Sequence, residues 1–278
     1  LAAVPAYGRP VISAGPRPAR PRERSPARPY QGSDGRRAAS PPRRDQTVSR
    51  AAAQGIWAII PAGGRGVRMG RKKPGIGLGG RPILRWTLDV FEATPGVRGI
   101  VVVVPEEDVP EWRRRLAAYR RVRAVVAGGE VRQASVARGL AAVPPDASFI
   151  VVHDGVRPCI TPALVRRVIA EARAHGAAIA ALPVAETLKR GADAWVKDTV
   201  DRDGLWSVQT PQAFRADLLR EAHRRAGAEG IVATDDAALV ERLGAPVRLV
   251  PGLPGNVKLT HPADLRLARA LLSAGGGR

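Results

Sequence analysis

The sequence IWAIIPAGGRGVRMG, residues 56–70, decides the fold because it joins a short apolar run to a glycine-rich segment. A continuous apolar run of this length predicts a buried strand of a parallel sheet. Open α/β sheets bind ligands in the loops at the carboxyl ends of such strands. We therefore expect a strand over 56–61 and a phosphate-binding loop directly after it.

The glycine-rich loop differs from the two common phosphate-binding fingerprints. Met69 stands where the dinucleotide motif G-x-G-x-x-G requires its third glycine after Gly64 and Gly66, and no Gly-Lys-Ser/Thr follows as in Walker A. Glycine also serves tight turns in proteins that bind no ligand. The loop alone therefore leaves both interpretations open.

Alternating elements follow the first strand. Apolar runs that predict parallel strands occupy 99–105, 122–127, 149–154 and 177–184, and amphipathic patterns that predict helices follow Arg81, Asp108, Arg132 and Thr161. This alternation predicts an α/β fold with a mostly parallel sheet and flanking helices. Residues 185–212 interrupt it with two polar, threonine-rich halves, which predict a β-hairpin arm that projects from the sheet.

The formal net charge of the chain is +20, and a large part of it lies in the first 54 residues. This segment contains eleven Arg against three acidic residues, and it is too rich in Pro, Arg and Ala to bury a core. We expect 1–54 to be a disordered and dispensable tail, part of which is not native because the sequence begins with Leu1. Residues 55–274 are expected to form one domain, with no fused enzyme after it.

Cysteine content and hydropathy limit the compartment. Cys159 is the only cysteine, which excludes an intrachain disulfide, and the four histidines show no metal-ligand spacing. No apolar run approaches the roughly 18 to 20 residues that span a bilayer. We therefore expect a cytoplasmic protein.

A second apolar run ends in a cluster of ionisable residues, VVHDGVRP at 151–158. Asp154 and Arg157 are expected at the same edge of the sheet as the glycine-rich loop. A carboxylate there can hold Mg²⁺, and an arginine can bind phosphate. The alternative is an internal ion pair between Asp154 and Arg157 that closes the loop, and His153 is expected to be a packed residue rather than a base.

Seven motifs together resemble the 2-C-methyl-D-erythritol 4-phosphate cytidylyltransferase family, over residues 56–272. They occur in the family's order and are PAGGRGVRMG (61–70), GGEVRQASV (128–136), VHDGVRP (152–158), ETLKR (186–190), TVDRDGLWSVQTPQAF (199–214), TDDA (234–237) and GNVKLTHPADL (255–265). The resemblance implies a Rossmann-like nucleotidyltransferase fold and a homodimer. It also implies Mg²⁺-dependent transfer of CMP from CTP to 2-C-methyl-D-erythritol 4-phosphate, with release of pyrophosphate, in non-mevalonate isoprenoid precursor synthesis.

The site residues that the resemblance implies fall into four groups. It assigns nucleotide binding to Ala62, Gly63, Gly64, Gly129, Glu130 and Ser135, and catalysis to Arg68, Lys73 and Lys258. It assigns acceptor binding to Arg157, Thr187, Arg202 and Thr210, and Mg²⁺ binding to Asp154. Such a reaction needs no general base, because the acceptor phosphate is already ionised, so arginine and lysine serve to position the polyanions and stabilise charge.

Two other functions remain open at the level of sequence. Ribitol-phosphate cytidylyltransferases share these motifs, and VDRDGLW and TPQ favour the erythritol acceptor only modestly. The basic tail is also compatible with a nucleic-acid-binding or scaffold protein, or a weakly active nucleotide-binding homologue, built on the same fold. Against nucleic-acid binding, no aromatic residues alternate with basic ones as in single-strand binders.

The segment GRKKPGIGLGGRP at 70–82 departs from the family pattern. Counting back from Gly79 and Gly80 places Lys73 at the catalytic lysine of the family, whereas matching the proline places Gly75 there. We prefer Lys73 because the GGRPIL anchor is longer.

This alignment predicts the effect of substituting each lysine. Lys73→Ala is expected to lower kcat about a hundred- to a thousandfold, because loss of one preorganised charge in a transition state typically has that effect. Lys72→Ala, which changes the same charge one position away, is the control and is expected to stay near the unaltered rate. If steady-state kinetics give the reverse result, the alignment is wrong by one position.

Overall fold

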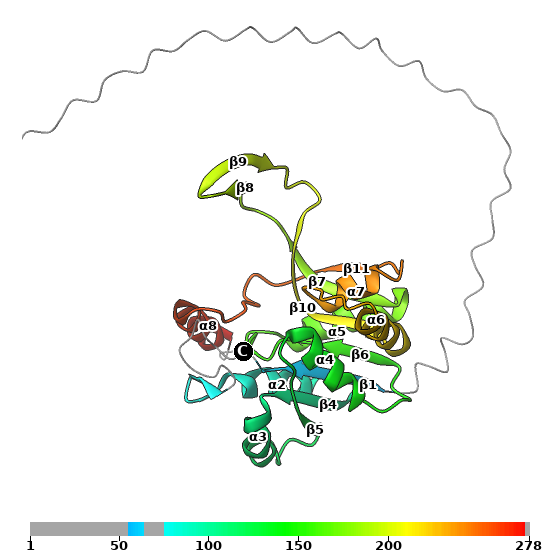
Figure 1. Ribbon diagram of the computed structural model, residues 1–278. Coiled ribbons are helices and arrows are strands. Elements are labelled where there is room, and N and C mark those ends of the chain that lie inside the picture. The colour runs from blue at the N-terminus through cyan, green and yellow to red at the C-terminus, as the bar shows by residue number, and fades with distance from the viewer. Residues whose placement is uncertain (1–54, 64–74, 276–278) are drawn as a thin grey trace, which may run out of the picture. The chain divides into compact units, whose positions relative to one another are not determined.

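A seven-stranded sheet forms the centre of the fold in the computed structural model (Figure 1), which describes residues 55–63 and 75–275. The strand order is β11–β7–β10–β6–β1–β4–β5. The strands are β1 (Ile56–Pro61), β4 (Val97–Val104), β5 (Val122–Ala127), β6 (Phe149–Val152), β7 (Ala177–Pro183), β10 (Trp206–Arg215) and β11 (Arg248–Pro251). Within this sheet β10 is antiparallel to both neighbours, and all other pairs are parallel. The predicted α/β fold with a mostly parallel sheet is confirmed.

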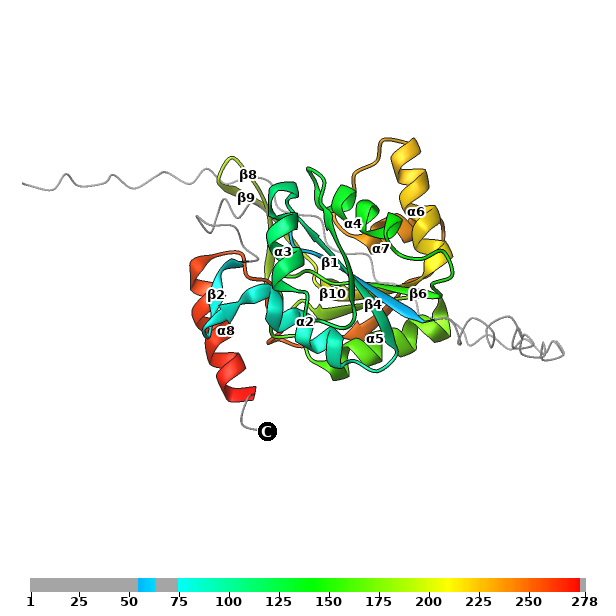
Figure 2. The ribbon, with the colours of Figure 1, turned by 90° about the horizontal axis from the view of Figure 1, so that it is seen from below.

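Helices cover both faces of the sheet because successive strand residues point to opposite sides. In β4, Ile100 and Val102 pack in one apolar cluster, whereas Val101 and Val103 pack in the other. The first cluster contains side chains of α2 (Ile83–Ala93), α3 (Val109–Arg115) and α5 (Pro162–His175). The second contains side chains of α4 (Arg132–Ala141), α6 (Ala216–Ala228) and α7 (Asp236–Glu241). Figure 2 shows α2 and α5 on one side of the sheet and α4 and α6 on the other.

The C-terminal helix α8 (Pro262–Gly275) brings a late segment of the chain back to the sheet edge. Through a third apolar cluster that includes Leu78 and Leu259, it packs on the short strand β2 (Gly77–Leu78), which pairs with β3 (Arg81–Pro82). The backbone N–H of Leu259 donates to the carbonyl of Val156 at 2.9 Å. This bond places Lys258 beside the loop that follows β6.

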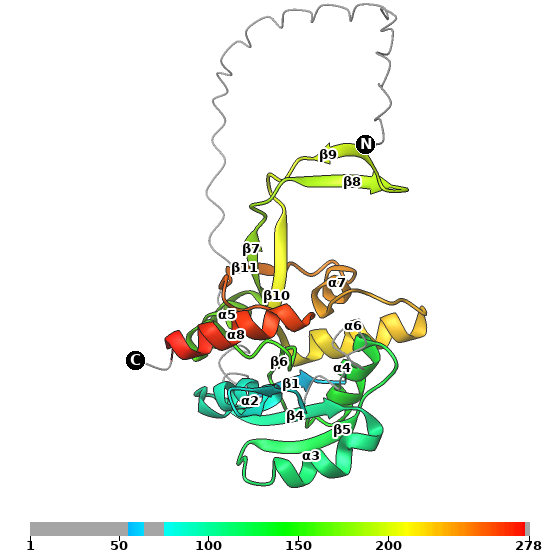
Figure 3. The same cartoon turned by 90° about the vertical axis from the view of Figure 1, so that its left-hand side faces the viewer.

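The hairpin of β8 (Leu188–Ala192) and β9 (Trp195–Val200) stands away from the sheet (Figure 3). Its turn has positive φ at Asp193 and Ala194, the twist that suits a two-residue hairpin. The range expected for the arm, 185–212, contains this hairpin and also the first part of β10, which belongs to the central sheet. Polar residues interrupt the apolar ones in that part of β10, so the sequence lacked the apolar run that marks the other strands.

Three expectations concern residues outside those that the structure describes. They are the disorder of the 1–54 tail, the nucleotide-binding role of Gly64, and the catalytic roles of Arg68 and Lys73. Among the described helices, none is long and apolar enough to cross a membrane.

The close approach of α4 to the sheet predicts opposite effects for two glycine substitutions. A Cβ on Gly139 would lie 2.6 Å from Ile59 Cγ2 and 3.1 Å from Val103 Cγ2, whereas a Cβ on Gly227 in α6 would meet no atom within 4 Å. Gly139→Ala is expected to destabilise the protein by about 1 to 3 kcal/mol, the usual effect of overpacking. Gly227→Ala is expected to stabilise it by about 0.5 to 1 kcal/mol through helix propensity. Denaturant unfolding measures both, and equal effects of the two would contradict the packing described.

Candidate active site

The loops at the carboxyl ends of β1, β4, β5 and β6 surround a cavity of about 820 Å³. Backbone bonding continues past the strand ends and fixes these loops together. The N–H of Ala62 donates to Val103 O, that of Gly128 to Val104 O, and that of His153 to Ile59 O. Seven of the residues implied by the resemblance line this cavity: Ala62, Gly63, Gly129, Glu130, Ser135, Asp154 and Lys258.

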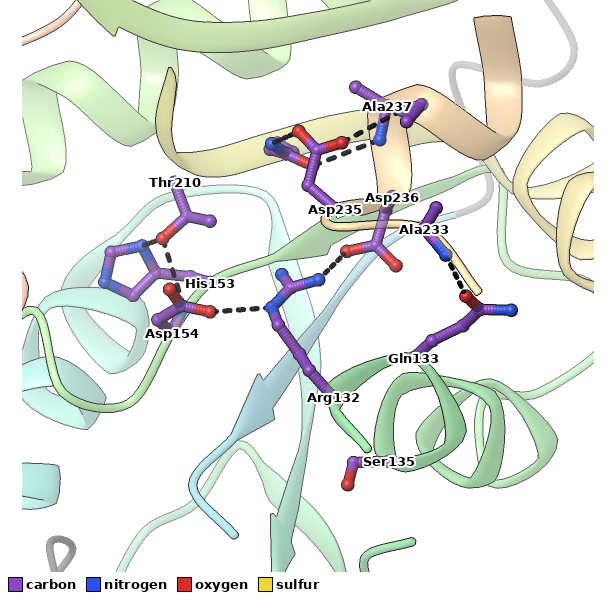
Figure 4. Close-up of polar contacts among 12 residues, drawn as sticks. Arg132, Gln133, Ser135, His153, Asp154, Thr210, Ala233, Asp235, Asp236 and Ala237 are labelled. Carbon is purple, nitrogen blue, oxygen red and sulfur yellow. Dashed lines mark hydrogen bonds and ion pairs between the residues drawn. The ribbon is translucent and has the colours of Figure 1, made fainter. Parts of the chain in front are cut away.

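The carboxylate of Asp154 contacts several cations, of which Figure 4 shows Arg132. Its Oδ1 accepts from Arg132 Nε at 3.0 Å, and its Oδ2 accepts from Lys258 Nζ at 2.8 Å. Arg157 Nε is more distant, at 3.7 Å from Oδ2. Burial would raise the pKa of Asp154, but the neighbouring cations outweigh it and hold that pKa well below its usual range. Asp154 is therefore ionised in spite of its burial.

A buried pair, His153 and Thr210, holds the backbone of Asp154. The Thr210 hydroxyl accepts from the Asp154 N–H at 3.1 Å and lies 3.1 Å from His153 Nδ1. His153 Nε2 lies 3.3 Å from the carbonyl oxygen of Arg157, which can only accept, so the proton is on Nε2 and Nδ1 accepts from Thr210. Burial lowers the pKa of His153 to about 3, so the ring is neutral, and the expectation of a packed histidine agrees with the structure.

Arg157 and Asn256 connect the β6 loop to the segment before α8. Arg157 Nη1 donates to Asn256 O at 2.8 Å, and the Asn256 amide donates to Thr210 O at 2.8 Å. Arg157 Nε is buried and has no hydrogen-bond partner in the described part of the chain. Burial lowers the pKa of Arg157, which Asp154 only partly offsets. The ion pair considered as an alternative is thus present but is the longest of the three at Asp154.

A tight loop after β5 forms another wall of the cavity. Ser135 Oγ accepts from the Gly129 N–H at 3.1 Å, and Arg138 donates to Gly128 O at 2.6 Å. A Cβ on Gly129 would lie 2.5 Å from Ala134 Cβ, and one on Gly128 would lie 2.9 Å from Ser135 Oγ. Both glycines are therefore required by the close approach of this loop to α4.

Sequence comparison identifies the family that has this arrangement. The model of the 2-C-methyl-D-erythritol 4-phosphate cytidylyltransferase family matches residues 56–274. The chain belongs to this family.

Relatives and solved structures agree with the match. The 2-C-methyl-D-erythritol 4-phosphate cytidylyltransferase of Pelotomaculum thermopropionicum is 44% identical over 229 residues, which cover 80% of this chain and 96% of the relative. That of Geobacter metallireducens is 45% identical over 225 residues, covering 78% and 97%. Among crystal structures, 4-diphosphocytidyl-2C-methyl-D-erythritol synthase from Anaerococcus prevotii superposes with a TM-score of 0.72 at 31% identity, covering 82% of this chain and 100% of that one. The cytidylyltransferase from Thermus thermophilus gives 0.67 at 37% identity, covering 77% and 98%.

None of the four described residues that the family resemblance assigns to the acceptor lines the cavity, and two of them are remote from Asp154. Thr187 and Arg202 are exposed at the base of the arm, and the Arg202 guanidinium donates to Ala185 O. Neither is among the residues that line the cavity in the described chain. Their roles in this cytidylyltransferase family member stay predictions, as does that of Thr210, whose hydroxyl is engaged by His153 and Asp154.

Sequence reasoning missed three polar residues, of which Arg132 contacts Asp154 and the other two follow behind it. Arg132 donates through Nη1 to Asp236 at 2.7 Å, and His223 Nε2 lies 3.0 Å from the other oxygen of Asp236. Arg132 and Asp236 stand within the motifs GGEVRQASV and TDDA, so a signal was present. His223 is an isolated histidine of α6 and had none.

Proposed function

We propose that this protein transfers CMP from CTP to 2-C-methyl-D-erythritol 4-phosphate, which gives 4-diphosphocytidyl-2-C-methyl-D-erythritol and pyrophosphate. The observation that carries the proposal is the ionised Asp154 with Arg132, Lys258 and Arg157 around it, at the strand ends of a chain of this family. An oxygen of the acceptor phosphate forms a bond to the α-phosphorus of CTP. The bond from that phosphorus to the bridging oxygen breaks, and pyrophosphate leaves.

The site needs to supply charge and position rather than a base. A phosphate monoester loses its second proton near pH 6, so the acceptor is a dianion at neutral pH. The buried His153 agrees with this, because it is neutral and both of its ring nitrogens are engaged. Cations that are fixed before the substrates bind stabilise the charge that develops on the transferred phosphoryl group.

Lys258 is the cation best suited to bridge the substrates. Its side chain is 42% exposed, against 24% for Arg132 and 11% for Arg157, so it can turn toward a bound phosphate. An ammonium has three donors. It can therefore keep its contact with Asp154 and donate to phosphate oxygens at the same time.

Asp154 is the residue that would hold Mg²⁺. Among the described residues no group of three or more His, Cys, Asp or Glu could hold a metal ion by itself. Mg²⁺ commonly uses one or two carboxylates, with substrate phosphates and water as the other ligands, so a single ionised carboxylate fits it. When bound, the ion neutralises phosphate charge and orients the triphosphate.

The glycine-rich walls would hold the cytidine. Ala62 and Gly63 lie on one side of the cavity, and Gly129, Glu130 and Ser135 lie on another. Backbone groups at the glycines allow close approach of a ligand. We assign CTP to this part of the cavity and the acceptor to the region next to Asp154 and Arg157, although Arg157 does not line the cavity itself.

The reaction is tested by pyrophosphate release. The purified protein is incubated with CTP, Mg²⁺ and either 2-C-methyl-D-erythritol 4-phosphate or ribitol 5-phosphate. We expect release that depends on the erythritol acceptor and falls at least tenfold with the ribitol acceptor or with another nucleoside triphosphate. The control omits the acceptor. Faster release with ribitol 5-phosphate would reassign the acceptor, and no release with either would overturn the proposal.

We further propose a homodimer in which the arm completes the acceptor site of the partner subunit. The arm presents Trp195 and Val196 at 77% and 65% exposure, and an isolated two-stranded hairpin is marginally stable in water. A second copy that covers these side chains would stabilise it. Arg202 would then act across the interface, whereas Arg68 would act in its own subunit.

This arrangement predicts complementation between two inactive variants. Arg68→Ala and Arg202→Ala dimers are mixed under conditions shown to exchange subunits. Random pairing makes roughly half the dimers mixed, and each mixed dimer has one intact site, so about a quarter of the unaltered activity is expected to return. The separate variants are the controls. If mixing restores no activity, Arg202 serves its own subunit.

A further inference from the structure

A row of four side chains connects α6 to the floor of the cavity. His223 contacts Asp236 at 3.0 Å, Asp236 contacts Arg132 at 2.7 Å, and Arg132 contacts Asp154 at 3.0 Å. Figure 4 shows the Arg132 guanidinium between the two carboxylates. The side chains of His223 and Asp236 are only 5% and 1% exposed, so this row lies inside the protein.

The position of Asp236 relative to Arg132 is fixed by a second set of contacts. Gln133, the neighbour of Arg132, donates to Ile231 O at 2.9 Å and accepts from the Ala233 N–H at 2.8 Å. These two bonds hold the segment before α7 against α4. Arg132 in α4 and Asp236 in α7 are therefore held near each other by the Gln133 hydrogen bonds as well as by their own ion pair.

A buried ion pair is weak support for stability. Desolvation of each ion costs several kcal/mol, and apolar residues of similar volume often stabilise a protein as well or better. The burial of Asp236 is therefore better explained by its effect on Arg132. The Arg132 side chain extends from Asp236 in the interior to Asp154 in the cavity.

The geometry of the guanidinium shows what this effect is. Arg132 binds Asp154 through Nε and Asp236 through Nη1, which are separate corners of one rigid plane. Its Nη2 is buried and has no partner among the described residues. Arginine commonly binds a carboxylate in a bidentate manner, with two parallel N–H···O bonds. If the guanidinium plane were free to rotate, Nε and Nη2 of Arg132 would bind Asp154 in this way. Asp154 Oδ2, which now contacts Lys258, would then be shared with Arg132.

We propose that Asp236, supported by His223, is a positioning residue that keeps Arg132 in single contact with Asp154, so that Oδ2 stays available to Lys258. The consequence for catalysis rests on the proposed function. The geometric part stands on the contacts alone.

The test uses Asp236→Asn in the full chain, because this change removes the charge and keeps the shape. We expect kcat per CTP-binding site, with sites counted by isothermal titration calorimetry, to fall about tenfold to a hundredfold, the usual effect of losing a supporting partner. The KM for CTP is expected to change less than about twofold. Asp235→Asn is the matched control, since Asp235 caps α7 and contacts Gln212 but not Arg132, and Asn caps equally well. This control is expected to keep the unaltered kcat.

A double-mutant cycle separates positioning from a general structural role. Arg132→Lys keeps the charge but cannot hold two carboxylates at fixed corners, so it is expected to lower kcat as Asp236→Asn does. If Asp236 acts through Arg132, the double variant is no slower than Arg132→Lys alone. Independent, multiplying losses would overturn the proposal, as would an unaltered kcat in Asp236→Asn. If Asp236→Asn fails to fold, the Arg132→Lys variant alone tests the proposal. An unaltered kcat in Arg132→Lys would overturn the proposal.

A crystal structure of Asp236→Asn tests the geometry without turnover. We expect Arg132 Nε and Nη2 both to contact Asp154. If Arg132 keeps its single contact with Asp154 in Asp236→Asn, the positioning proposal is overturned. If the unaltered protein gives no product with either acceptor, only the proposed function is refuted.

Discussion

The ionised, buried carboxylate of Asp154 is the interaction on which the site depends. A lone carboxylate at this depth would take up a proton, and it stays charged because Arg132, Lys258 and Arg157 approach it from three different segments of the chain. The dependence is mutual, because the same carboxylate offsets the repulsion among three cations held close together. The fold must therefore bring the Asp154 carboxylate and its three cations into contact before any substrate binds.

The parallel sheet makes this delivery possible. Strands β1, β4, β5 and β6 all end at one edge, and their ladder of backbone bonds continues into the loops, so residues far apart in sequence meet there. Lys258 lies on a separate segment, which α8 and the apolar cluster around Leu78 hold beside the sheet. This chain thus combines loops that are joined by backbone hydrogen bonds with one more exposed cation.

The sequence was sufficient to predict the elements that bury apolar side chains on both faces. The runs at 56–61 and 149–154 gave strands at nearly those bounds, and their loops contain Ala62, Gly63 and Asp154 as expected. It failed for β10, because Gln209, Thr210 and Gln212 are buried there through hydrogen bonds rather than apolar contact. The link from Arg132 to Asp236 spans 104 positions, and no periodic pattern encodes a pairing at that separation.

Strand β10 passes from solvent to the site within one continuous element. Residues 206–208 are exposed beside the arm, whereas 209–214 are buried between β7 and β6. Residues 206–208 are exposed although they pair with β7, and Thr210, which holds the backbone of Asp154, lies two positions further along the strand. The outer residues of β10 and the residue that holds the Asp154 backbone are thus separated by one position of the same strand. The hairpin and Asp154 are therefore connected through one short strand. The rigidity of that strand determines how far a displacement of the hairpin is transmitted to the site.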